Sequence, residues 1–373
     1  MRPPHLALAR AWRARARPSI HELTVGQVRQ LTDDSVALSF AIPAELHEAY
    51  RFKAGQHVTI VWDRDGDEVR RSYSICVPEG SGQLTVAVRT IAGGAFSAYA
   101  NERIRVGDSL RVMTPMGSFV ASPIPGQAAK HVAVAVGSGI TPILSIIATV
   151  LDMEPSSSFV LLYQNRTENS TMFREDLLHL QQIYGERLEV YHAWSRQMNS
   201  SQQFNGRLDR PRLQRFADLI AEGQQLCSVH QWFLCGPGAL MDDITSLLLE
   251  RDVPLSRVRR ELFFDPSGAD EDDRLNQIPS LTSKVTIRAG NAVTQFDLPS
   301  RGESILSAAV RLRPDIPYSC QDGICATCRA KVASGQVFMT RCSGLDKSEQ
   351  EQGYVLTCQS HPLTANLLLD FDA

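Results

Sequence analysis

Apolar and polar residues alternate along the first third of the chain in short runs separated by turns. Runs of this kind occupy residues 36–40, 57–62 and 84–88. The turns between them contain the glycines Gly55, Gly66, Gly80 and Gly82. Alternation with a period of two places successive side chains on opposite faces of a strand. Many short strands at this spacing predict an antiparallel β-barrel over residues 21–126.

The pattern changes over residues 127–264, where apolar runs alternate with stretches of helical periodicity. The apolar runs are residues 131–136, 159–163, 188–192 and 231–234. The helical stretches are residues 142–151, 171–182 and 238–250. This alternation predicts an α/β domain with a parallel sheet, whose ligand should bind at the carboxyl ends of the strands.

Residues 132–151 carry no charge, and a segment of this length is long enough to cross a bilayer. Gly137, Gly139 and Pro142 interrupt the segment, and its first part is rich in valine and alanine. We therefore interpret it as a buried strand, a tight turn and a buried helix, and we expect no membrane association.

The segments before the predicted barrel and after the predicted α/β domain differ from these domains in composition. Residues 1–20 contain five arginines, no acidic residue and no continuous apolar segment, so we expect a disordered basic tail and not a secretory signal. An arginine-rich transit peptide and an upstream start codon are the alternatives. Residues 265–283 contain acids, Pro266 and Gly268 without apolar periodicity, which predicts a linker. Residues 284–373 then form a small third domain.

The composition narrows the functional classes. The 373 residues are 43% hydrophobic, and a net charge of −3 argues against a nucleic-acid partner. Four of the eight cysteines show no paired spacing: Cys76, Cys227, Cys235 and Cys342. This usage favours the reducing cytoplasm over a disulfide framework.

The most specific signal is a cysteine motif near the C-terminus. Cys320, Cys325 and Cys328 have the spacing C-x4-C-x2-C, and Cys358 follows after 29 residues. Thiolates at this spacing hold plant-type 2Fe–2S clusters, and Gly323 lets the loop wrap closely around such a cluster. A structural zinc site is the alternative, although it more often has two C-x2-C pairs.

Two motifs of the predicted barrel suit a ligand that combines a planar ring with a diphosphate. Arg71, Ser72, Tyr73 and Ser74 lie on one strand, where alternation places Arg71 and Tyr73 on the same face. Arg71 can neutralise a pyrophosphate, Tyr73 can stack on a planar ring and Ser74 can bond a ring nitrogen. A loop that opens a predicted helix offers free N–H groups to a diphosphate. It consists of Gly93, Gly94, Ala95, Phe96 and Ser97. A solvated strand edge and an ordinary turn are the alternatives.

Two further turns follow strands of the predicted parallel sheet. The first opens a helix, so its N–H groups and the helix dipole can face a phosphate. It consists of Gly137, Ser138, Gly139, Ile140, Thr141 and Pro142, without the third glycine of the dinucleotide fingerprint. The second consists of Cys235, Gly236 and Pro237. The thiol there either lies beside a nicotinamide or is a buried structural cysteine.

Arg166 and Arg196 each follow the end of a predicted strand. Arginines at this position can bind the 2′-phosphate of NADPH, and neither strand ends in the acid expected for the free ribose of NADH. Ordinary surface arginines are the alternative.

Together these motifs resemble the ferredoxin–NADP reductase superfamily with a C-terminal plant-type ferredoxin domain, over residues 20–373. Within it the chain is most similar to the reductase subunits of phenylacetyl-CoA epoxidases. The segments that carry this likeness are residues 50–57, 71–76, 94–97, 137–142, 146–149, 241–243 and 369–373. The basic tail and Cys342 are departures from the family pattern.

The resemblance implies an FAD-binding antiparallel β-barrel, an α/β nucleotide domain with a parallel sheet, and an α+β ferredoxin domain of the β-grasp type. It implies that Tyr73 lies on the isoalloxazine ring and Ser74 near its central nitrogen. The other FAD ligands would be Arg71, Ser72, Gly94, Ala95, Phe96 and Ser97. The turns at 137–142 and 235–237 would bind NADPH or NADH, with Glu261 and Phe263 beside the flavin. The expected catalytic residues are Ser74, Cys235 and Glu261, and the cluster ligands are Cys320, Cys325, Cys328 and Cys358.

The function that this resemblance implies is electron transfer. NADPH would reduce FAD, which would pass single electrons to the 2Fe–2S cluster and on to an oxygenase. The implied partner is a di-iron epoxidase that acts on phenylacetyl-CoA in phenylacetate catabolism. A reductase for another oxygenase, such as a steroid hydroxylase, is one alternative. A non-catalytic zinc-binding scaffold is another.

Overall fold

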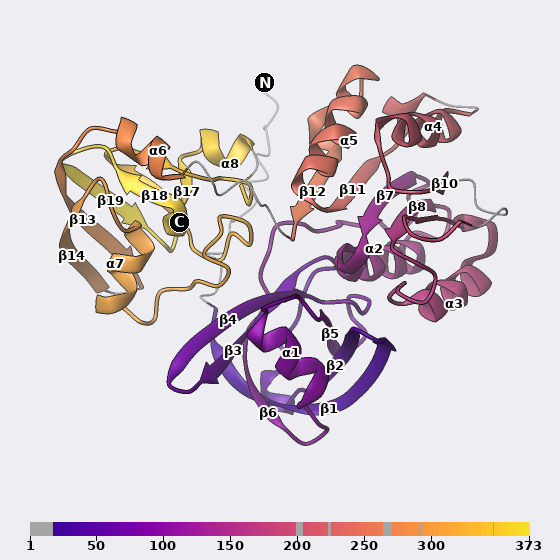
Figure 1. The fold of residues 1–373 in the computed structure, drawn as a ribbon, viewed down its shortest axis with the longest axis horizontal. Coiled ribbons are helices and arrows are strands. Elements are labelled where there is room, and N and C mark those ends of the chain that lie inside the picture. The colour runs from indigo at the N-terminus through magenta and orange to yellow at the C-terminus, as the bar shows by residue number, and fades with distance from the viewer. Residues whose placement is uncertain (1–17, 199–203, 223–224, 264–270, 291, 346) are drawn as a thin grey trace, which may run out of the picture. The chain divides into compact units, whose positions relative to one another are not determined.

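The structure is a computed structural model that describes residues 18–198, 204–222, 225–263, 271–290, 292–345 and 347–373. The chain divides into two compact units, and Figure 1 shows the course of the chain through its helices and strands. The larger unit contains Ser19–Glu271 and Tyr318–Thr327, and the smaller one contains Asp272–Pro317 and Cys328–Ala373.

Six antiparallel strands form a barrel in the larger unit. They are β1 (Ile20–Thr32), β2 (Ser35–Ala41), β3 (His57–Arg64), β4 (Asp67–Ser74), β5 (Leu84–Arg89) and β6 (Ser109–Met113). They pair in the order β4-β3-β6-β1-β2-β5, and a bridge between Ile75 and Val86 joins the two ends of that row. Alternate side chains fill the interior with an apolar core that includes Leu38 and Ile60. The predicted antiparallel β-barrel is confirmed.

A parallel sheet with helices on both faces makes up the rest of the larger unit. Its strands are β7 (Lys130–Val136), β8 (Ser158–Asn165), β9 (Leu188–Trp194), β10 (Phe204–Asn205), β11 (Gln231–Gly236) and β12 (Val258–Leu262). Its helices are α2 (Ile140–Met153), α3 (Arg174–Tyr184), α4 (Arg210–Ala221) and α5 (Gly238–Glu250). Helices α2 and α3 pack on one face and α4 and α5 on the other. The predicted α/β domain is confirmed.

In the strand order β10-β9-β8-β7-β11-β12, the chain adds β8, β9 and β10 on one side of β7 and then reverses to add β11 and β12 on the other side. Ligands of open parallel sheets bind outside the carboxyl ends of the strands at such a reversal. Both glycine turns singled out in the sequence follow the two strands concerned, β7 and β11, so the topology brings them to one crevice.

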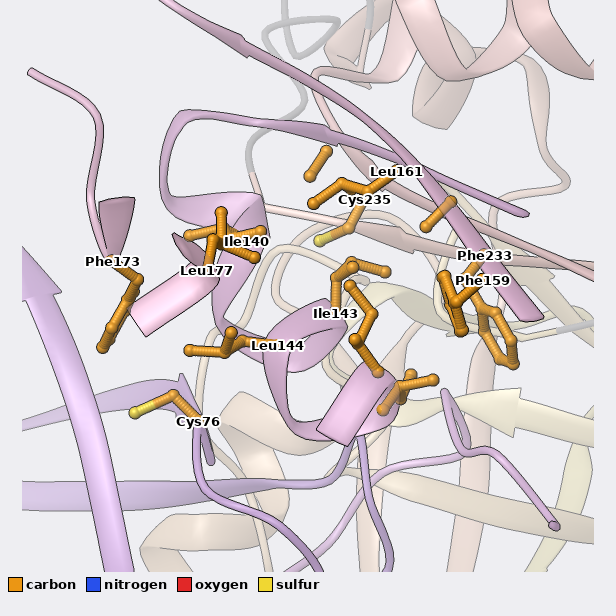
Figure 2. Packing of buried hydrophobic residues seen from close by; sticks show 14 of the residues in the cluster. Cys76, Ile140, Ile143, Leu144, Phe159, Leu161, Phe173, Leu177, Phe233 and Cys235 are labelled. Atoms are coloured by element: carbon orange, nitrogen blue, oxygen red, sulfur yellow. The ribbon is translucent and has the colours of Figure 1, made fainter. Parts of the chain in front are cut away.

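One apolar core joins the barrel to the parallel sheet, as Figure 2 shows for Cys76, Ile143 and Phe233. Gly55 permits the close approach, because it has a φ of +98° and a Cβ there would lie only 3.0 Å from Cδ1 of Ile146 in α2. The Ser145 hydroxyl of α2 also donates to the carbonyl of Val77 at 2.6 Å. The barrel and the sheet are therefore packed as one body.

The uncharged segment 132–151 is a strand, a turn and a helix, as predicted. It runs through β7, the 3-10 turn η2 (Gly137–Gly139) and α2. Among the residues that the structure describes, no helix combines the length and the apolar character needed to span a membrane.

The smaller unit contains a mixed five-stranded sheet and a packed helix. The strands are β13 (Thr282–Ala289), β14 (Ala292–Pro299), β15 (Arg329–Ser334), β17 (Tyr354–Leu356) and β19 (Asn366–Asp370), in the order β14-β13-β19-β15-β17. A second sheet pairs β16 (Val337–Met339) with β18 (Ser360–Pro362). Its helices include α7 (Ile305–Leu312) and the short α8 (Lys347–Glu351). Only β13 and β19 are parallel neighbours among the described strands of the larger sheet. This α+β arrangement confirms the expected ferredoxin-type domain.

Three elements depart from the sequence predictions. The tail predicted over 1–20 lies outside the described residues up to residue 17, whereas Ile20 already belongs to β1. The segment predicted as a linker, 265–283, includes the helix α6 (Glu271–Gln277) and the start of β13, and residues 265–270 lie outside the description. Helix α4 was not predicted, although Asp209 caps it by accepting from the N–H of Arg212 at 3.1 Å.

Candidate active site

The flavin side of the candidate site begins at the end of β4. Ser74 is buried, Ser72 and Tyr73 are half-buried and Arg71 is exposed. The cation fixed in the interior is the preceding residue, Arg70, whose Nε donates to Glu68 at 2.7 Å. The exposed Arg71 guanidinium donates from Nη1 to the carbonyl of Arg70 at 2.7 Å, which leaves its other N–H groups for a ligand phosphate, and Ser74 presents its hydroxyl inside the structure.

The glycine loop that follows β5 leads into helix α1 (Ala95–Glu102), with Gly94 as its N-cap. Ser97 braces the turn, because its hydroxyl accepts from the N–H of Ile91 at 3.1 Å and donates to the carbonyl of Gly94 at 2.9 Å. The Phe96 ring lies 5.8 Å from the Tyr73 ring, centroid to centroid. The structure thus brings the loop and the β4 motif together. An exposed arginine, an aromatic ring and an open helix N-terminus fit a flavin diphosphate.

The turn after β7 has the compact geometry that a nucleotide phosphate requires. Gly137 has a φ of +55°, and the Tyr163 hydroxyl donates to its carbonyl at 3.0 Å. Thr141 donates from its hydroxyl to the carbonyl of Ser138 at 3.0 Å, within the first turn of the helix that also contains Ile140 and Pro142. The turn therefore points the N-terminus of α2 toward the crevice at the strand ends.

The two glycine turns touch each other through Gly139. A Cβ at this position would lie 2.4 Å from the carbonyl oxygen of Cys235, so no larger residue fits without movement. Cys235 is fully buried. Burial and the nearby Glu261 raise the pKa of the Cys235 thiol well above its usual value, which keeps it neutral. Gly236 follows in β11, and Pro237 is the N-cap of α5.

A hydrogen bond links the flavin motif to the end of the parallel sheet. The Ser74 hydroxyl donates to Oε2 of Glu261 in β12 at 3.3 Å. Burial raises the pKa of Glu261 to about 8, although the bond from Ser74 opposes the shift. The carboxyl group is therefore largely protonated at neutral pH. Phe263, two residues further on, exposes 38% of its surface.

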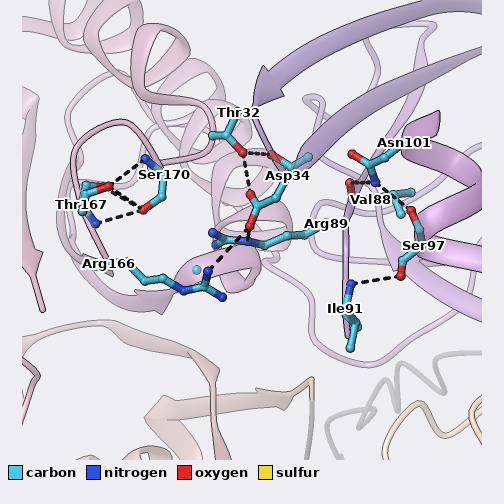
Figure 3. Close-up of polar contacts among 12 residues, drawn as sticks. Thr32, Asp34, Val88, Arg89, Ile91, Ser97, Asn101, Arg166, Thr167 and Ser170 are labelled. Carbon is cyan, nitrogen blue, oxygen red and sulfur yellow. Dashed lines mark hydrogen bonds and ion pairs between the residues drawn. The ribbon is translucent and has the colours of Figure 1, made fainter. Parts of the chain in front are cut away.

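The two predicted strand-end arginines lie side by side. The backbone N–H of Arg196 donates to the carbonyl of Arg166 at 2.8 Å, and both residues are exposed. Arg166 lies 3.9 Å from the carboxylate of Asp34, which also accepts from Arg89 at 3.0 Å (Figure 3). The sequence reasoning missed Asp34 and Arg89, because they come from the barrel and no motif connects them to Arg166.

The four motif cysteines fall into two pairs, one in each compact unit. In the first pair, the N–H groups of Asp322 and Cys325 both donate to Sγ of Cys320 at 3.4 Å. Backbone donors of this kind stabilise a thiolate and suit a cluster ligand. The loop is shaped by positive φ values at Gln321, Gly323 and Ala326.

In the second pair, Cys328 and Cys358 are both buried. The carbonyl of Cys328 accepts from the Thr357 hydroxyl at 2.9 Å, next to Cys358. Within the described residues, no three His, Cys, Asp or Glu side chains are grouped so as to hold a metal ion. The donor chemistry of each pair nevertheless fits an iron–sulfur cluster, since thiolates are its usual ligands.

Comparison with known families agrees with the order of these sites along the chain. Residues 22–120 match the oxidoreductase FAD-binding domain, and residues 133–246 match the oxidoreductase NAD-binding domain. Residues 292–363 match the 2Fe-2S iron-sulfur cluster binding domain. A flavin domain, a nicotinamide nucleotide domain and a 2Fe–2S domain in one chain define an NAD(P)H-dependent oxidoreductase.

The chain belongs to the family of the E subunit of 1,2-phenylacetyl-CoA epoxidase, as the resemblance indicated. It is 42% identical to that protein of Escherichia coli (strain K12), over 95% of this chain and 98% of the relative. It is 31% identical to the ferredoxin reductase component of 3-ketosteroid-9-alpha-monooxygenase of Rhodococcus rhodochrous, over 94% of this chain and 96% of the relative.

A solved structure shares the fold. Phthalate dioxygenase reductase, described as a modular structure for electron transfer from pyridine nucleotides to [2Fe-2S], superposes with a TM-score of 0.55 and 23% identity. The match covers 94% of this chain and 98% of that one. All three domains therefore have counterparts in a single known chain.

Proposed function

We propose that this protein takes electrons from NADPH and passes them through FAD and a 2Fe–2S cluster to an oxygenase. The observation that carries the proposal is the hydrogen bond between Ser74 of the barrel and Glu261 of the sheet. It joins β4, whose residues we infer to bind the flavin, to β12 at the strand ends of the parallel sheet. The two cofactors would therefore react where the two motifs converge.

Bound FAD supplies the chemistry that accepts two electrons from a nicotinamide and releases them singly to a one-electron centre. The protein holds a proton at this point, because the Glu261 carboxyl has a pKa of about 8 and bonds the Ser74 hydroxyl. A group with this pKa can exchange a proton near neutral pH. Cys235, as a neutral buried thiol, would shape the nicotinamide pocket beside Gly139.

The roles of the remaining ligands follow from their positions. Arg71 and the N-terminus of α1 would bind the FAD diphosphate, and the turn at 137–142 would bind the diphosphate of NADPH. Arg166 and Arg196 would bind its 2′-phosphate. The cluster ligands would be Cys320, Cys325, Cys328 and Cys358, with the N–H groups around Cys320 stabilising the cluster sulfurs.

The similarity to a component of an epoxidase supports an oxygenase as the electron acceptor. We assign as partner a di-iron epoxidase that acts on phenylacetyl-CoA, since that relative shares 42% of its residues with this chain over nearly its whole length. A second candidate is a steroid monooxygenase, because a component of such a system is 31% identical over a similar length.

An anaerobic titration of the purified protein with NADPH and, separately, with NADH tests the electron path. Absorbance should report loss of oxidised flavin, and electron paramagnetic resonance should report a reduced 2Fe–2S cluster. Ser74→Ala should slow flavin reduction at least tenfold, whereas Ser81→Ala, a change at an exposed barrel serine, should not. A colourless protein that contains zinc and ignores both nucleotides would contradict the proposal.

The choice of partner needs a separate experiment. The reduced protein is mixed with a purified phenylacetyl-CoA epoxidase or a purified 3-ketosteroid monooxygenase, and product formation is measured for each. Turnover only with the epoxidase supports our assignment, and turnover only with the steroid enzyme favours the second candidate.

A further inference from the structure

The turn between β1 and β2 carries an aspartate that lies between two arginines. Asp34 accepts at one carboxylate oxygen from Nε of Arg89 at 3.0 Å, and the same oxygen lies 3.9 Å from Nη1 of Arg166 (Figure 3). Its other oxygen accepts from the Thr32 hydroxyl at 2.8 Å. The carboxylate comes from the barrel, whereas Arg166 follows β8 of the parallel sheet. The contact therefore crosses from the flavin half to the nucleotide half of one compact body.

The two arginines differ in how far they are committed to this carboxylate. The Arg89 side chain is only 12% exposed, whereas that of Arg166 is 57% exposed and its distance of 3.9 Å is that of a loose ion pair. Arg89 is thus the fixed partner, and Arg166 is the movable one.

The carboxylate also keeps its charge at this position. Partial burial alone would raise the pKa of Asp34, but the Thr32 hydroxyl and Arg89 hold it below its usual value. Asp34 is therefore negative at neutral pH. Its charge offsets part of the positive charge that the two arginines bring to the strand ends.

The group formed by Asp34, Arg89 and Arg166 lies beside the turn that would bind the nucleotide. A Cβ on Gly137 would lie 3.4 Å from Nη1 of Arg89, so the arginine from the barrel reaches the first residue of that turn. Any dinucleotide on the turn would have its adenosine end at the carboxyl ends of the neighbouring strands. A 2′-phosphate that bound Arg166 would have the carboxylate of Asp34 nearby, since that carboxylate lies 3.9 Å from the guanidinium.

We propose that Asp34 is a specificity-determining residue that weakens the preference for NADPH over NADH by restraining Arg166 and opposing the 2′-phosphate. The inference rests on the proposed function in that a nicotinamide nucleotide binds at this turn with its 2′-phosphate near Arg166. NADPH differs from NADH by one doubly charged group, so a fixed negative charge nearby discriminates against NADPH alone. The barrel thereby takes part in a choice that the parallel sheet would otherwise make by itself.

Asp34→Asn tests this inference, with Asp33→Asn as the matched control. Both residues lie in the same turn, but Asp33 is exposed. The flavin-containing protein is assayed for the ratio of kcat/KM with NADPH to kcat/KM with NADH. Asp34→Asn should raise this ratio about three- to tenfold, mainly through a lower KM for NADPH, as expected when one charge is removed near a partly solvated phosphate. Asp33→Asn should leave it unchanged.

Binding without turnover gives an independent measure. Calorimetric titration with 2′,5′-ADP and with 5′-AMP should show tighter binding of 2′,5′-ADP to Asp34→Asn and no change for 5′-AMP. Asp34→Glu retains the charge and should behave as the wild type. An unchanged or lower NADPH preference in Asp34→Asn, or an equal rise of that preference in Asp34→Asn and Asp33→Asn, would overturn the inference.

In Asp34→Asn, Arg89 loses its carboxylate partner, and this loss could destabilise the variant. Arg166→Gln then provides a second test of the inference. This variant should lower the NADPH to NADH ratio at least fivefold, and adding Asp34→Asn to it should then raise the ratio by less than Asp34→Asn does in the wild type, because only the direct repulsion of the phosphate is left to remove. An unchanged ratio in Arg166→Gln would refute the role of Asp34 while flavin reduction by both nucleotides upheld the proposed function. Failure of both nucleotides to reduce the wild-type flavin would instead refute the proposed function.

Discussion

Glu261→Gln should change how the stability of the larger unit depends on pH. The carboxyl group has an ordinary pKa of 4.5 and a pKa of about 8 in the folded protein. The folded state therefore binds a proton that the unfolded state releases over this interval, so stability falls as the pH rises from about 5 to about 8 and is level above that. One pKa unit corresponds to about 1.4 kcal/mol, so the loss of stability over this interval is at most about 5 kcal/mol. Because Glu261 is only half-buried as a residue, we expect about 2–4 kcal/mol.

Glutamine has nearly the same shape, can accept the bond from Ser74 and cannot ionise. The variant should match the wild type near pH 5 and exceed its stability by about 2–4 kcal/mol near pH 9. Urea unfolding followed by tryptophan fluorescence reports on this unit, because it contains Trp62, Trp194 and Trp232. Glu102→Gln, at an exposed position of α1, is the control and should not alter the pH dependence. Equal losses of stability between pH 5 and pH 9 in wild type and Glu261→Gln would refute the reasoning.

Three further predictions concern the glycine contact, a buried acid and the cluster. Gly139→Ala should destabilise the protein by about 2–4 kcal/mol in urea unfolding, since its Cβ would lie 2.4 Å from the carbonyl oxygen of Cys235. Gly26→Ala, whose Cβ would have its nearest neighbour at 3.7 Å, should be close to neutral, and equal losses of stability in the two variants would contradict the role of the Gly139 contact. Burial opposes ionisation of Glu154, but hydrogen bonds from Ser157 and Ile124 hold its pKa below its usual value. Glu154→Gln should therefore lower the free energy of unfolding by about 1–3 kcal/mol at pH 7 and by less as the pH falls below 4, and a loss that stays constant with pH would contradict this reasoning. Cys358→Ser should abolish most of the bound iron and acid-labile sulfide while FAD content stays unchanged, whereas Cys342→Ser should retain both, and the reverse result would reassign the fourth ligand.

The architecture was predictable because its two halves have different periodicities. Strands such as β3 and β5 follow the alternation of a barrel wall, and β7 and β8 are continuous apolar runs, as expected for strands buried on both faces. The glycine turns were predictable for a related reason. A turn such as Gly137–Gly139 follows a strand and precedes a helix, and the chain must there reverse its direction beside a ligand site. Helix α4 also carried a readable signal that we missed, with Leu213, Phe216, Ala217 and Ile220 spaced to form one buried face.

The details of the candidate site were less predictable because they depend on contacts between distant segments. Alternation along β4 correctly separates Arg70 from Arg71, but it does not say which of the two faces is buried. In the fold Arg70 is buried and donates to the carboxylate of Glu68, whereas Arg71 is exposed. The group of Asp34, Arg89 and Arg166 joins three segments that no local pattern connects. Local sequence reveals the chemistry of each group, and only the packing reveals which groups meet.

The packing of α2 explains both an ambiguity of the sequence and the stiffness of the site. Every residue of the helix from Ile140 to Leu151 is buried, because the helix lies between the parallel sheet and the barrel. A helix that is apolar all round has the composition of a membrane span, and here the second apolar surface is supplied by the barrel. The same helix begins at the nucleotide turn, and its Ser145 bonds the barrel at Val77. A shift of α2 toward either neighbour would therefore move the phosphate-binding N-terminus relative to Ser74, which is why we expect a well-packed α2 to be a condition for electron transfer and not only for stability.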